Sequence, residues 1–266
     1  MLKRIKDSLN ARLVIPWTIK HFEITKYGKT IACYKNKHCG QRCFLIGNGP
    51  SLKAEDLSLL KRNNEITFGF NRIYNIFDQT EWRPTYYISQ DEKMLGGCIA
   101  EVNGLTLPVK MIPIQLKWFH DISIKDALYF NMKGTTEGDL PFSDNCSHEL
   151  YNSATCMYTA AQFAVYMGFS EIYLLGVDHQ FRISQNNSGK IVVDESVKDY
   201  FTDKYNEDRE KLYIPNTENS TNTYIAMREQ CERRNVTVYN ATRGGKLEVF
   251  SRKSFDELFF DEEKNV

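Results

Sequence analysis

The segment Ser153–His179, with the sequence SATCMYTAAQFAVYMGFSEIYLLGVDH, constrains the fold more than any other part of the chain. Its apolar residues first recur at helical spacing, and Ser153 suits the N-cap of that helix while Gly168 suits its end. The run Ile172–Leu175 then follows with no polar alternation. A strand of this kind is buried on both faces, as in a parallel sheet that helices cover.

Short apolar runs alternate with helical stretches along the chain from Lys35 onward. We predict one further helix that starts at Ser51 and another over Thr223–Arg233. The predicted strands are Cys43–Ile46, Glu65–Phe70, Thr85–Ser89, Pro108–Ile114, Ala127–Asn131, Ile172–Leu175 and Val236–Tyr239. This alternation predicts an α/β fold with a doubly wound, mostly parallel, Rossmann-like sheet.

The length of 266 residues suits one large domain with small appendages. We expect the domain to cover residues 35–258, after a basic amphipathic extension over 1–34 and before an acidic tail over 259–266. Residues 185–222 interrupt the pattern with a long polar insert. An insert of this type is either disordered or a lid over an active site.

The N-terminal extension alternates basic and apolar side chains and contains Trp17. Its basic residues are Lys3, Arg4, Lys6, Arg12 and Lys20, and its apolar ones include Leu2, Ile5, Leu9, Leu13 and Ile15. Such a segment can lie on an anionic membrane surface. It can equally form a helix that packs on its own domain or joins two copies in a homo-oligomer.

The composition limits the classes of partner and the cellular compartment that we expect. Lys and Arg number 34 against 34 Asp and Glu, a balance that argues against a nucleic-acid partner. The 7 cysteines form no framework, which favours reduced thiols in the cytoplasm. No apolar run has the length to span a bilayer, so we expect a cytoplasmic protein that is at most peripheral on the inner membrane face. His38, Cys39 and Cys43 lack a second ligand pair, so we expect no metal site.

Polar side chains or glycines follow the predicted strands. The groups in question are Gly47-Asn48-Gly49-Pro50-Ser51, Asn71, Gln90 with Asp91, Asp178 with His179, and Asn240-Ala241-Thr242-Arg243-Gly244-Gly245. Ligands of such sheets bind outside the carboxyl ends of the strands, so this convergence predicts a nucleotide-type ligand. The glycines would let the backbone approach it, and a helix starting at Ser51 would favour an anion. A structural turn is the alternative reading of GNGPS, and of Arg243-Gly244-Gly245, which would otherwise be a second anion contact.

Four blocks of the sequence resemble a known family. IGNGPSL, FNRIY, MGFSEIYLLGVDH and YNATRGGKLEVF are similar to the MptE-like domain proteins, which include archaeal 6-hydroxymethylpterin diphosphokinases and bacterial proteins of surface polysaccharide and flagellin glycosylation. IGNGPSL and GFSEIYLLGVD also resemble the bacterial sialyltransferases of glycosyltransferase family 42. The resemblance covers about residues 43–258 and implies a sialyltransferase-like fold more specifically than it implies a reaction.

The likeness to the sialyltransferases implies roles for individual residues. Gly47, Asn48 and Gly49 would lie against the phosphate and ribose of CMP, and Asn71 would hold the nucleotide. Gln90 stands where that family has a second asparagine. The remaining implied contacts are Ser153 and Thr155 at a helix N-terminus facing the donor, Asp178 near the cytosine or ribose, and Tyr200 and Tyr205 on the leaving phosphate.

The insert departs from the sialyltransferase pattern because it contains no histidine to act as the base. His179 follows a predicted strand, and an ordinary histidine pKa suits deprotonation of an acceptor hydroxyl at neutral pH. A histidine that holds a loop carbonyl is the structural alternative. His148 and Asp91 are the other candidate bases.

These observations lead to one expected function and two alternatives. The expected function is an inverting, metal-independent glycosyltransferase that moves an acidic sugar from a CMP-activated donor to a glycan or lipid-linked acceptor, with no cofactor. The first alternative is a pterin diphosphokinase that uses ATP and Mg²⁺, with carboxylates from Asp91, Glu92 and Asp178. The second is a non-catalytic nucleotide-binding scaffold of a polysaccharide assembly system.

Overall fold

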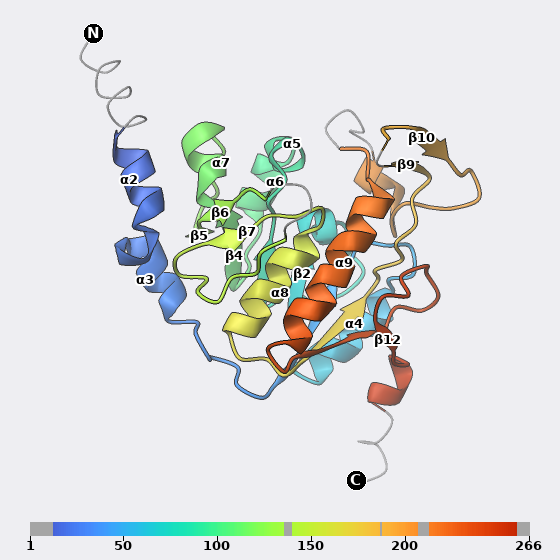
Figure 1. Ribbon diagram of the computed structural model, residues 1–266. Coiled ribbons are helices and arrows are strands. Elements are labelled where there is room, and N and C mark those ends of the chain that lie inside the picture. The colour runs from blue at the N-terminus through green and yellow to red at the C-terminus, as the bar shows by residue number, and fades with distance from the viewer. Residues whose placement is uncertain (1–12, 136–139, 187, 207–212, 260–266) are drawn as a thin grey trace.

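A computed structural model describes residues 13–135, 140–186, 188–206 and 213–259 of the chain. Its centre is an eight-stranded sheet in the order β12-β11-β8-β1-β2-β3-β4-β5, in which every neighbouring pair is parallel (Figure 1). The strands are β1 (Arg42–Ile46), β2 (Ile66–Phe70), β3 (Tyr86–Ile88), β4 (Val109–Pro113), β5 (Ala127–Phe130), β8 (Glu171–Leu175), β11 (Thr237–Asn240) and β12 (Ser251–Arg252). The predicted α/β fold is confirmed.

The central strands are buried because their side chains are apolar on both faces. In β1, β2 and β8 every residue after the first is buried. Cys43 of β1 lies opposite Ile66 of β2 on one side and Ile172 of β8 on the other. The seven predicted strands therefore match seven observed ones to within a residue or two at their ends, and β12 adds a short edge.

The strand order reverses at β1, which makes the sheet doubly wound. From β1 the chain proceeds outward through β2, β3, β4 and β5, whereas β8, β11 and β12 lie on the other side of β1. Right-handed crossovers in opposite directions put α4 (Ala54–Arg62) and α9 (Thr217–Glu232) on opposite faces of the sheet. Figure 1 shows α8 (Cys156–Tyr166) beside α9 in front of the strands.

Shorter elements decorate the carboxyl ends and edges of the strands. They are η3 (Asn71–Ile76), α5 (Glu92–Gly96), α6 (Ile99–Gly104), α7 (Ile114–Phe119), a small parallel pair of β6 (Met132–Lys133) with β7 (Leu150–Tyr151), and a hairpin of β9 (Ile183–Gln185) with β10 (Ile191–Val193). Because η3, α5 and α7 follow directly after β2, β3 and β4, they rise from the rim that carries the strand ends.

The N-terminal segment consists of α2 (Ile15–Lys20), η2 (Phe22–Ile24) and α3 (Lys26–Ala32). Phe22 and Ile31 are fully buried in the main core, so from Phe22 onward the segment predicted as an extension packs with the domain. Thr25 accepts a hydrogen bond from the Gly28 N–H and so begins α3. Residues 1–12, with most of the predicted basic positions, lie outside the described residues.

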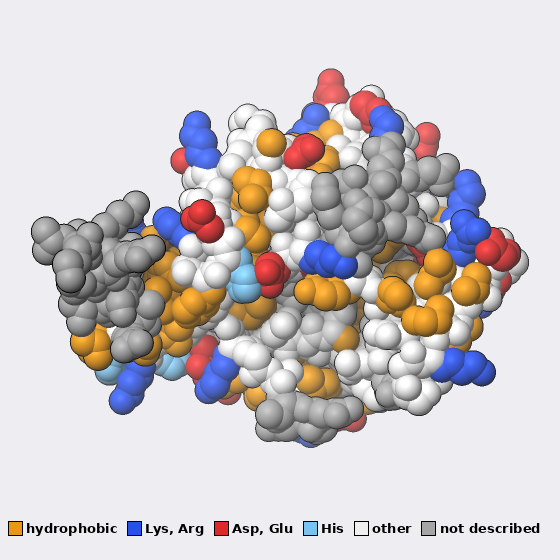
Figure 2. Space-filling model, turned by 90° about the horizontal axis from the view of Figure 1, so that it is seen from above, with side chains coloured by type: hydrophobic (Ala, Val, Ile, Leu, Met, Phe, Trp, Pro, Cys, Tyr) orange, Lys and Arg blue, Asp and Glu red, His pale blue; other side chains and the backbone are white. Residues whose placement is uncertain are grey.

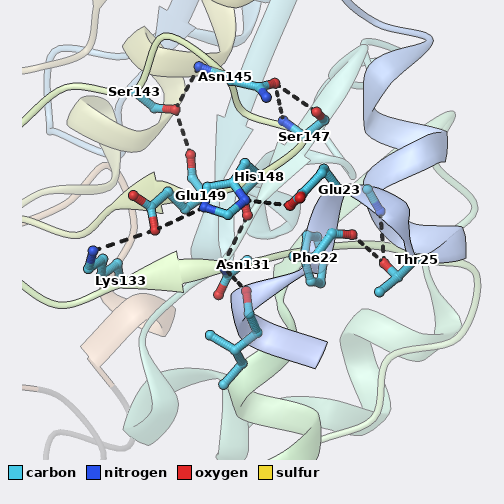
Figure 3. Close-up of polar contacts among 12 residues, drawn as sticks. Phe22, Glu23, Thr25, Asn131, Lys133, Ser143, Asn145, Ser147, His148 and Glu149 are labelled. Carbon is cyan, nitrogen blue, oxygen red and sulfur yellow. Dashed lines mark hydrogen bonds and ion pairs between the residues drawn. The ribbon is translucent and has the colours of Figure 1, made fainter. Parts of the chain in front are cut away.

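Polar contacts fasten this segment to the sheet (Figure 3). Asn131, which follows β5, donates through Nδ2 to the carbonyl of Ile19 at 3.4 Å and to that of His148 at 3.0 Å. His148 Nδ1 lies 2.5 Å from the Glu23 carboxylate. This hydrogen bond lowers the pKa of Glu23. The end of α2 is therefore held close to the carboxyl end of β5.

The predicted insert is partly helical in the structure. Its first part holds the β9–β10 hairpin and η4 (Asp203–Asn206), but residues from Thr217 onward belong to α9. The N-cap of α9 is Asn216, whose side chain accepts from the Asn219 N–H at 2.9 Å. The helix predicted over Thr223–Arg233 is present as part of α9, but its start was predicted six residues too late, because the polar run NTENSTN was interpreted as a loop.

The C-terminal end packs against β1, and Phe259, the first residue of the predicted tail, is buried there. A short helix, η6 (Asp256–Leu258), places Phe255 and Phe259 against Phe44 of β1, with ring centroids 6.3 and 6.2 Å apart. Residues 260–266 lie outside the described part. Within the described ranges, no helix is long and apolar enough to cross a membrane.

Candidate functional site

The candidate site lies at the carboxyl ends of β1, β2, β3 and β8, where the strand order reverses. Parallel strands deliver the residues that follow them to one rim, and ligands of doubly wound sheets bind at such a reversal. The loops after these strands hold most of the residues predicted from the sequence. The N-terminus of α8 and the insert complete the surroundings.

The loop after β1 is tied to the loop after β8. The Gly49 N–H donates to the Gly176 carbonyl at 2.9 Å, and the Ser51 N–H and hydroxyl donate to Oδ2 of Asp178 at 3.3 and 2.7 Å. Burial raises the pKa of Asp178, and the two Ser51 hydrogen bonds oppose this rise. The Asp178 carboxylate therefore fixes the GNGPS turn through one of its oxygens.

The same contact explains the two glycines of the turn. A Cβ on Gly49 would lie 1.9 Å from Oδ2 of Asp178, and one on Gly47 would lie 2.3 Å from the Gly176 carbonyl oxygen. Real Cβ atoms do not approach so closely, so both positions need glycine for contact between two loops of the protein. The prediction that these glycines open the backbone to a ligand finds no support, and the alternative of a structural turn fits the contacts.

The helix after this turn begins later than predicted. Pro50 and Ser51 lie in the turn, and α4 starts at Ala54 with Lys53 as an N-cap that makes no side-chain hydrogen bond. The prediction of a helix from Ser51 was wrong because the Ser51 hydroxyl donates to Asp178 and caps no helix.

Asn48 and Gln90 each present a buried oxygen without a hydrogen-bond partner. Asn48 Nδ2 donates to the Phe70 carbonyl at 3.1 Å, and Gln90 Nε2 donates to Oδ1 of Asn152 at 2.9 Å. The Oδ1 atom of Asn48 and the Oε1 atom of Gln90 are buried and accept no hydrogen bond. A buried unpaired acceptor costs free energy unless something donates to it. Both oxygens therefore suit a ligand that carries hydroxyl or N–H groups.

Asn71 joins several parts of the rim. Its backbone has a φ of 52°, in the left-handed region, and its carbonyl accepts from the Tyr87 hydroxyl at 2.7 Å. Its Oδ1 accepts from the Ser89 hydroxyl at 3.3 Å and the Cys156 thiol at 3.9 Å. Its side chain also lies near Tyr205, whose pKa burial raises strongly. Asn71 thus connects β2, β3, α8 and the insert at a single point.

The start of α8 differs from the prediction by two residues. Thr155 is the N-cap and accepts from the Met157 N–H at 3.3 Å. Ser153, predicted as the N-cap, instead shares a 2.7 Å hydrogen bond with Thr223 of α9. Tyr224 of α9 lies near Thr155. Ser153 and Thr155 still lie at the N-terminal end of α8, where α9 meets it.

The insert reaches the rim through backbone contacts. The Phe201 N–H donates to the Asn48 carbonyl at 3.1 Å, and Arg72 donates to the Tyr205 carbonyl at 2.9 Å. The rings of Tyr200 and Tyr205 stack with centroids 3.8 Å apart. Residues 200–205 therefore lie against the loops after β1 and β2.

His179 lies beside α9, just beyond β8. Its Nε2 is 2.8 Å from the Thr221 hydroxyl oxygen, and its ring meets the Tyr224 ring edge-on at 5.5 Å. Burial lowers the pKa of His179, so the side chain stays neutral at pH values at which an exposed histidine would be protonated. Thr221 donates its own hydroxyl to the Thr217 carbonyl, which leaves its oxygen to accept from an Nε2–H of His179. In that arrangement Nδ1 is the basic nitrogen.

Three predicted residues have other roles in the structure. His148 faces Glu23 of the N-terminal segment, and its carbonyl accepts from Asn131 after β5 (Figure 3). Arg243 pairs with both Asp56 and Asp256, so its guanidinium is already neutralised by the protein. Asp91 caps α5 by accepting from the Met94 N–H at 2.8 Å, and burial raises its pKa. Neither a base role for His148 nor an anion contact for Arg243 fits these contacts.

Several residues of the rim were not predicted. They are Arg72, Ser89, Asn152, Cys156, Phe201, Thr221 and Tyr224. Asn152 precedes the predicted cap Ser153, so a wider reading of the α8 start could have included it. Among the residues that the structure describes, no three His, Cys, Asp or Glu side chains come together as metal ligands.

Comparison with known proteins identifies a family, and solved structures with a similar fold include a glycosyltransferase. Residues 18–184 match the family model described as 6-hydroxymethylpterin diphosphokinase MptE-like. A solved structure of the MAf glycosyltransferase from Magnetospirillum magneticum AMB-1 aligns with a TM-score of 0.49 and 17% sequence identity. The alignment covers 86% of this chain but only 38% of that protein. No curated protein sequence matches the chain.

Proposed function

The chain belongs to the MptE-like family, and from this premise we propose that it is a nucleotide-dependent transferase, specifically a glycosyltransferase that uses a CMP-activated acidic sugar. The acceptor is a glycan or a lipid-linked glycan. The site is the rim formed by the ends of β1, β2 and β3, the N-terminus of α8 and residues 200–205. The proposal depends chiefly on the unpaired oxygens of Asn48 and Gln90.

The chemistry of these two oxygens defines the part of the ligand that they meet. Both are side-chain amide oxygens, and the nitrogen of each amide already donates a hydrogen bond within the protein. A phosphate has no proton to give them at neutral pH, whereas ribose hydroxyls, sugar hydroxyls and the amine of cytosine do. Asn48 and Gln90 therefore bind the nucleoside or sugar part of the donor, and the phosphate lies elsewhere along the rim.

Residues 200–205 are the proposed lid, and their tyrosines supply hydrogen-bond donors for the phosphate. Tyr200 and Tyr205 come from the segment that lies against the loops after β1 and β2. A tyrosine hydroxyl can donate to a phosphate oxygen without adding charge, which stabilises the departing CMP as negative charge develops.

His179 is the proposed base of an inverting displacement. The acceptor hydroxyl attacks the anomeric carbon, its proton passes to Nδ1 of His179, and the bond from that carbon to the CMP phosphate breaks with its electron pair on the phosphate oxygen. A lowered pKa keeps His179 neutral and ready to accept the proton at pH 7. Thr221 orients the ring through Nε2.

A pterin diphosphokinase is the second candidate, because the family model carries that description. Such a reaction normally needs Mg²⁺ held by carboxylates beside the transferred phosphates. Asp178 uses one oxygen to hold Ser51, and Asp91 uses one to cap α5. These carboxylates have structural duties at the rim, so the donor set fits Mg²⁺ poorly. A non-catalytic nucleotide-binding scaffold is the third candidate.

Thermal unfolding with added nucleotides separates the candidates. The chain is heated with CMP, CDP, ATP or GTP, each with Mg²⁺ and with EDTA. The transferase proposal predicts that CMP raises the melting temperature and that EDTA does not abolish the rise. A rise with ATP that requires Mg²⁺ would support the diphosphokinase instead. If none of the four nucleotides shifts the transition, the proposed nucleotide site is wrong, and with it all three nucleotide-based candidates.

A further inference from the structure

The rim that holds the candidate site also carries most of the exposed large apolar side chains of the described chain. They come from the α2 segment, from α7, from the β9–β10 hairpin and from the residues just before α9, and they are Leu13, Val14, Trp17, Phe119, Ile191, Val192, Val193, Tyr213 and Ile214. Trp17 is 55% exposed. Figure 2, which looks down on this rim, shows hydrophobic side chains at both its left and right ends.

Independent contacts place these elements at one end of the molecule. Asn131, directly after β5, holds the carbonyl of Ile19 in α2. α7 begins at Ile114, directly after β4. Lys93 of α5, which follows β3, lies 5.4 Å from the Tyr213 ring. The elements that carry these apolar side chains therefore flank the carboxyl ends of the strands on both sides of the site, as the positions of α2, α7, β9 and β10 in Figure 1 also show.

The α2 segment is shaped for a surface. Leu13, Val14 and Trp17 share one helical face by their spacing and are exposed, whereas Ile15 faces inward and is buried. A helical segment that exposes a tryptophan and branched apolar residues leaves a face that water solvates poorly. Tryptophan is enriched where one side of a ring meets hydrocarbon and the other meets water.

The charge of the same segment selects the occupant. Residues 1–34 contain seven Lys and Arg (Lys3, Arg4, Lys6, Arg12, Lys20, Lys26 and Lys29) against the acidic Asp7 and Glu23. Lys20 lies exposed at the end of α2. In a chain whose overall charge balances, this local excess is complementary to anionic lipid headgroups. A second copy of the chain would bring like charges together at this face.

We propose that this face docks on an anionic bilayer surface, with α2 and the β9–β10 hairpin as its two points of contact. The candidate site then opens toward the headgroups. The polar contacts of Figure 3 hold α2 in a fixed position relative to the sheet, so docking sets the height of the site above the membrane. The proposal goes beyond the transferase reaction and stands whichever nucleotide the site binds.

Vesicle sedimentation of the full chain tests the proposal. Vesicles of phosphatidylcholine alone are compared with vesicles that also contain phosphatidylglycerol, at low and high salt. We expect the chain to sediment only with the anionic vesicles and to be released by salt. Trp17 should report the contact through a blue shift of fluorescence, which Trp17→Phe should remove while binding persists. A folded chain that stays in solution with both vesicle types would overturn the proposal.

A matched pair of charge reversals tests the orientation. Lys20 is the last residue of α2, on the proposed face. Arg62 is the last residue of α4, and because this helix runs back from the end of β1 to the start of β2, Arg62 lies at the opposite end of the sheet. Lys20→Glu should weaken binding to anionic vesicles at least about fivefold, and Arg62→Glu should leave it unchanged. Equal effects of the two substitutions would contradict the orientation.

Two further measurements test whether the hairpin contacts the membrane and whether a second copy of the chain occupies this face instead. Val192→Ser should weaken vesicle binding if the hairpin is the second point of contact, and no change would remove the hairpin from the proposal. Light scattering across a range of chain concentrations tests self-association. A dimer that Trp17→Ser disrupts, together with no vesicle binding by the native chain, would assign this face to a second copy and overturn the proposal.

Discussion

The Ser51 hydroxyl donates a 2.7 Å hydrogen bond to the Asp178 carboxylate and thereby joins the loops that follow β1 and β8. These strands flank the point where the sheet reverses its order. In many doubly wound sheets the corresponding glycine-rich turn receives a ligand. Here the Cβ positions of Gly47 and Gly49 are occupied by atoms of the loop after β8. The unpaired buried oxygens belong to Asn48, between these two glycines, and to Gln90, which follows β3.

Gly49→Ala should destabilise the fold. The new Cβ would lie 1.9 Å from Oδ2 of Asp178, so the carboxylate must move and its bonds to Ser51 weaken. Overpacking of this kind costs about 1–3 kcal/mol of unfolding free energy, which urea denaturation measures. Gly134→Ala is the control, because nothing lies within 4 Å of its Cβ position. Equal stability of the two variants would show that the loops do not meet as described.

Gln90→Met should weaken nucleotide binding more than it affects folding. It removes the buried Oε1 that awaits a ligand donor, and also the Nε2 hydrogen bond to Asn152, for a loss of about 1 kcal/mol in unfolding free energy. Titration calorimetry with CMP should show a dissociation constant raised by about tenfold or more. Gln79→Met, at an exposed position, is the control. Unchanged affinity in Gln90→Met would remove this residue from the site.

Asn71 should tolerate glycine better than alanine. Its φ of 52° suits glycine, whereas alanine pays about 1 kcal/mol more in unfolding free energy in the left-handed region. Both variants lose the side chain that contacts Ser89, Cys156 and Tyr205. We expect both to weaken CMP binding by about 1–3 kcal/mol. Native affinity in the glycine variant would mean that Asn71 shapes the backbone and binds no nucleotide.

His179 should make the fold less stable as the pH falls. Burial lowers its pKa, so the unfolded chain, with a pKa near 6.5, takes up the proton first. Its contribution is complete above about pH 6.5 and is lost as the pH falls toward the lowered folded pKa. The native chain should therefore lose more stability than His179→Gln between about pH 7.5 and 5. His38, whose pKa burial also lowers, titrates in both proteins and cancels in the difference. Parallel curves would contradict a buried neutral His179.

The central strands could be predicted because a strand that is buried on both faces has an uninterrupted run of apolar residues in the sequence. Cys43–Ile46 and Ile172–Leu175 are apolar without interruption, and both are central strands. The start of α9 has no such apolar pattern in the sequence. Its first turns are polar, yet Ser220 and Thr223 are buried where α9 meets α8, so tertiary contacts decide a helix that composition does not indicate.

The positions of the polar residues in the fold were predicted more accurately than the contacts that they make. Asn48, Asn71 and Gln90 were expected at the strand ends and are found there. The purpose of Gly47 and Gly49 was not visible, because the atoms that fill their Cβ positions come from residues more than 120 positions away in the chain, at Gly176 and Asp178. Arg243 likewise looked available until Asp56 and Asp256 proved to surround it.

A crystal structure of the chain with CMP tests the central claim most directly. The account predicts nucleoside density at the ends of β1, β2 and β3, with a hydroxyl or amine of CMP within hydrogen-bonding distance of both Asn48 Oδ1 and Gln90 Oε1. Residues 200–205 should cover the phosphate. Density for CMP elsewhere on the molecule, with those two oxygens still unpaired, would contradict it.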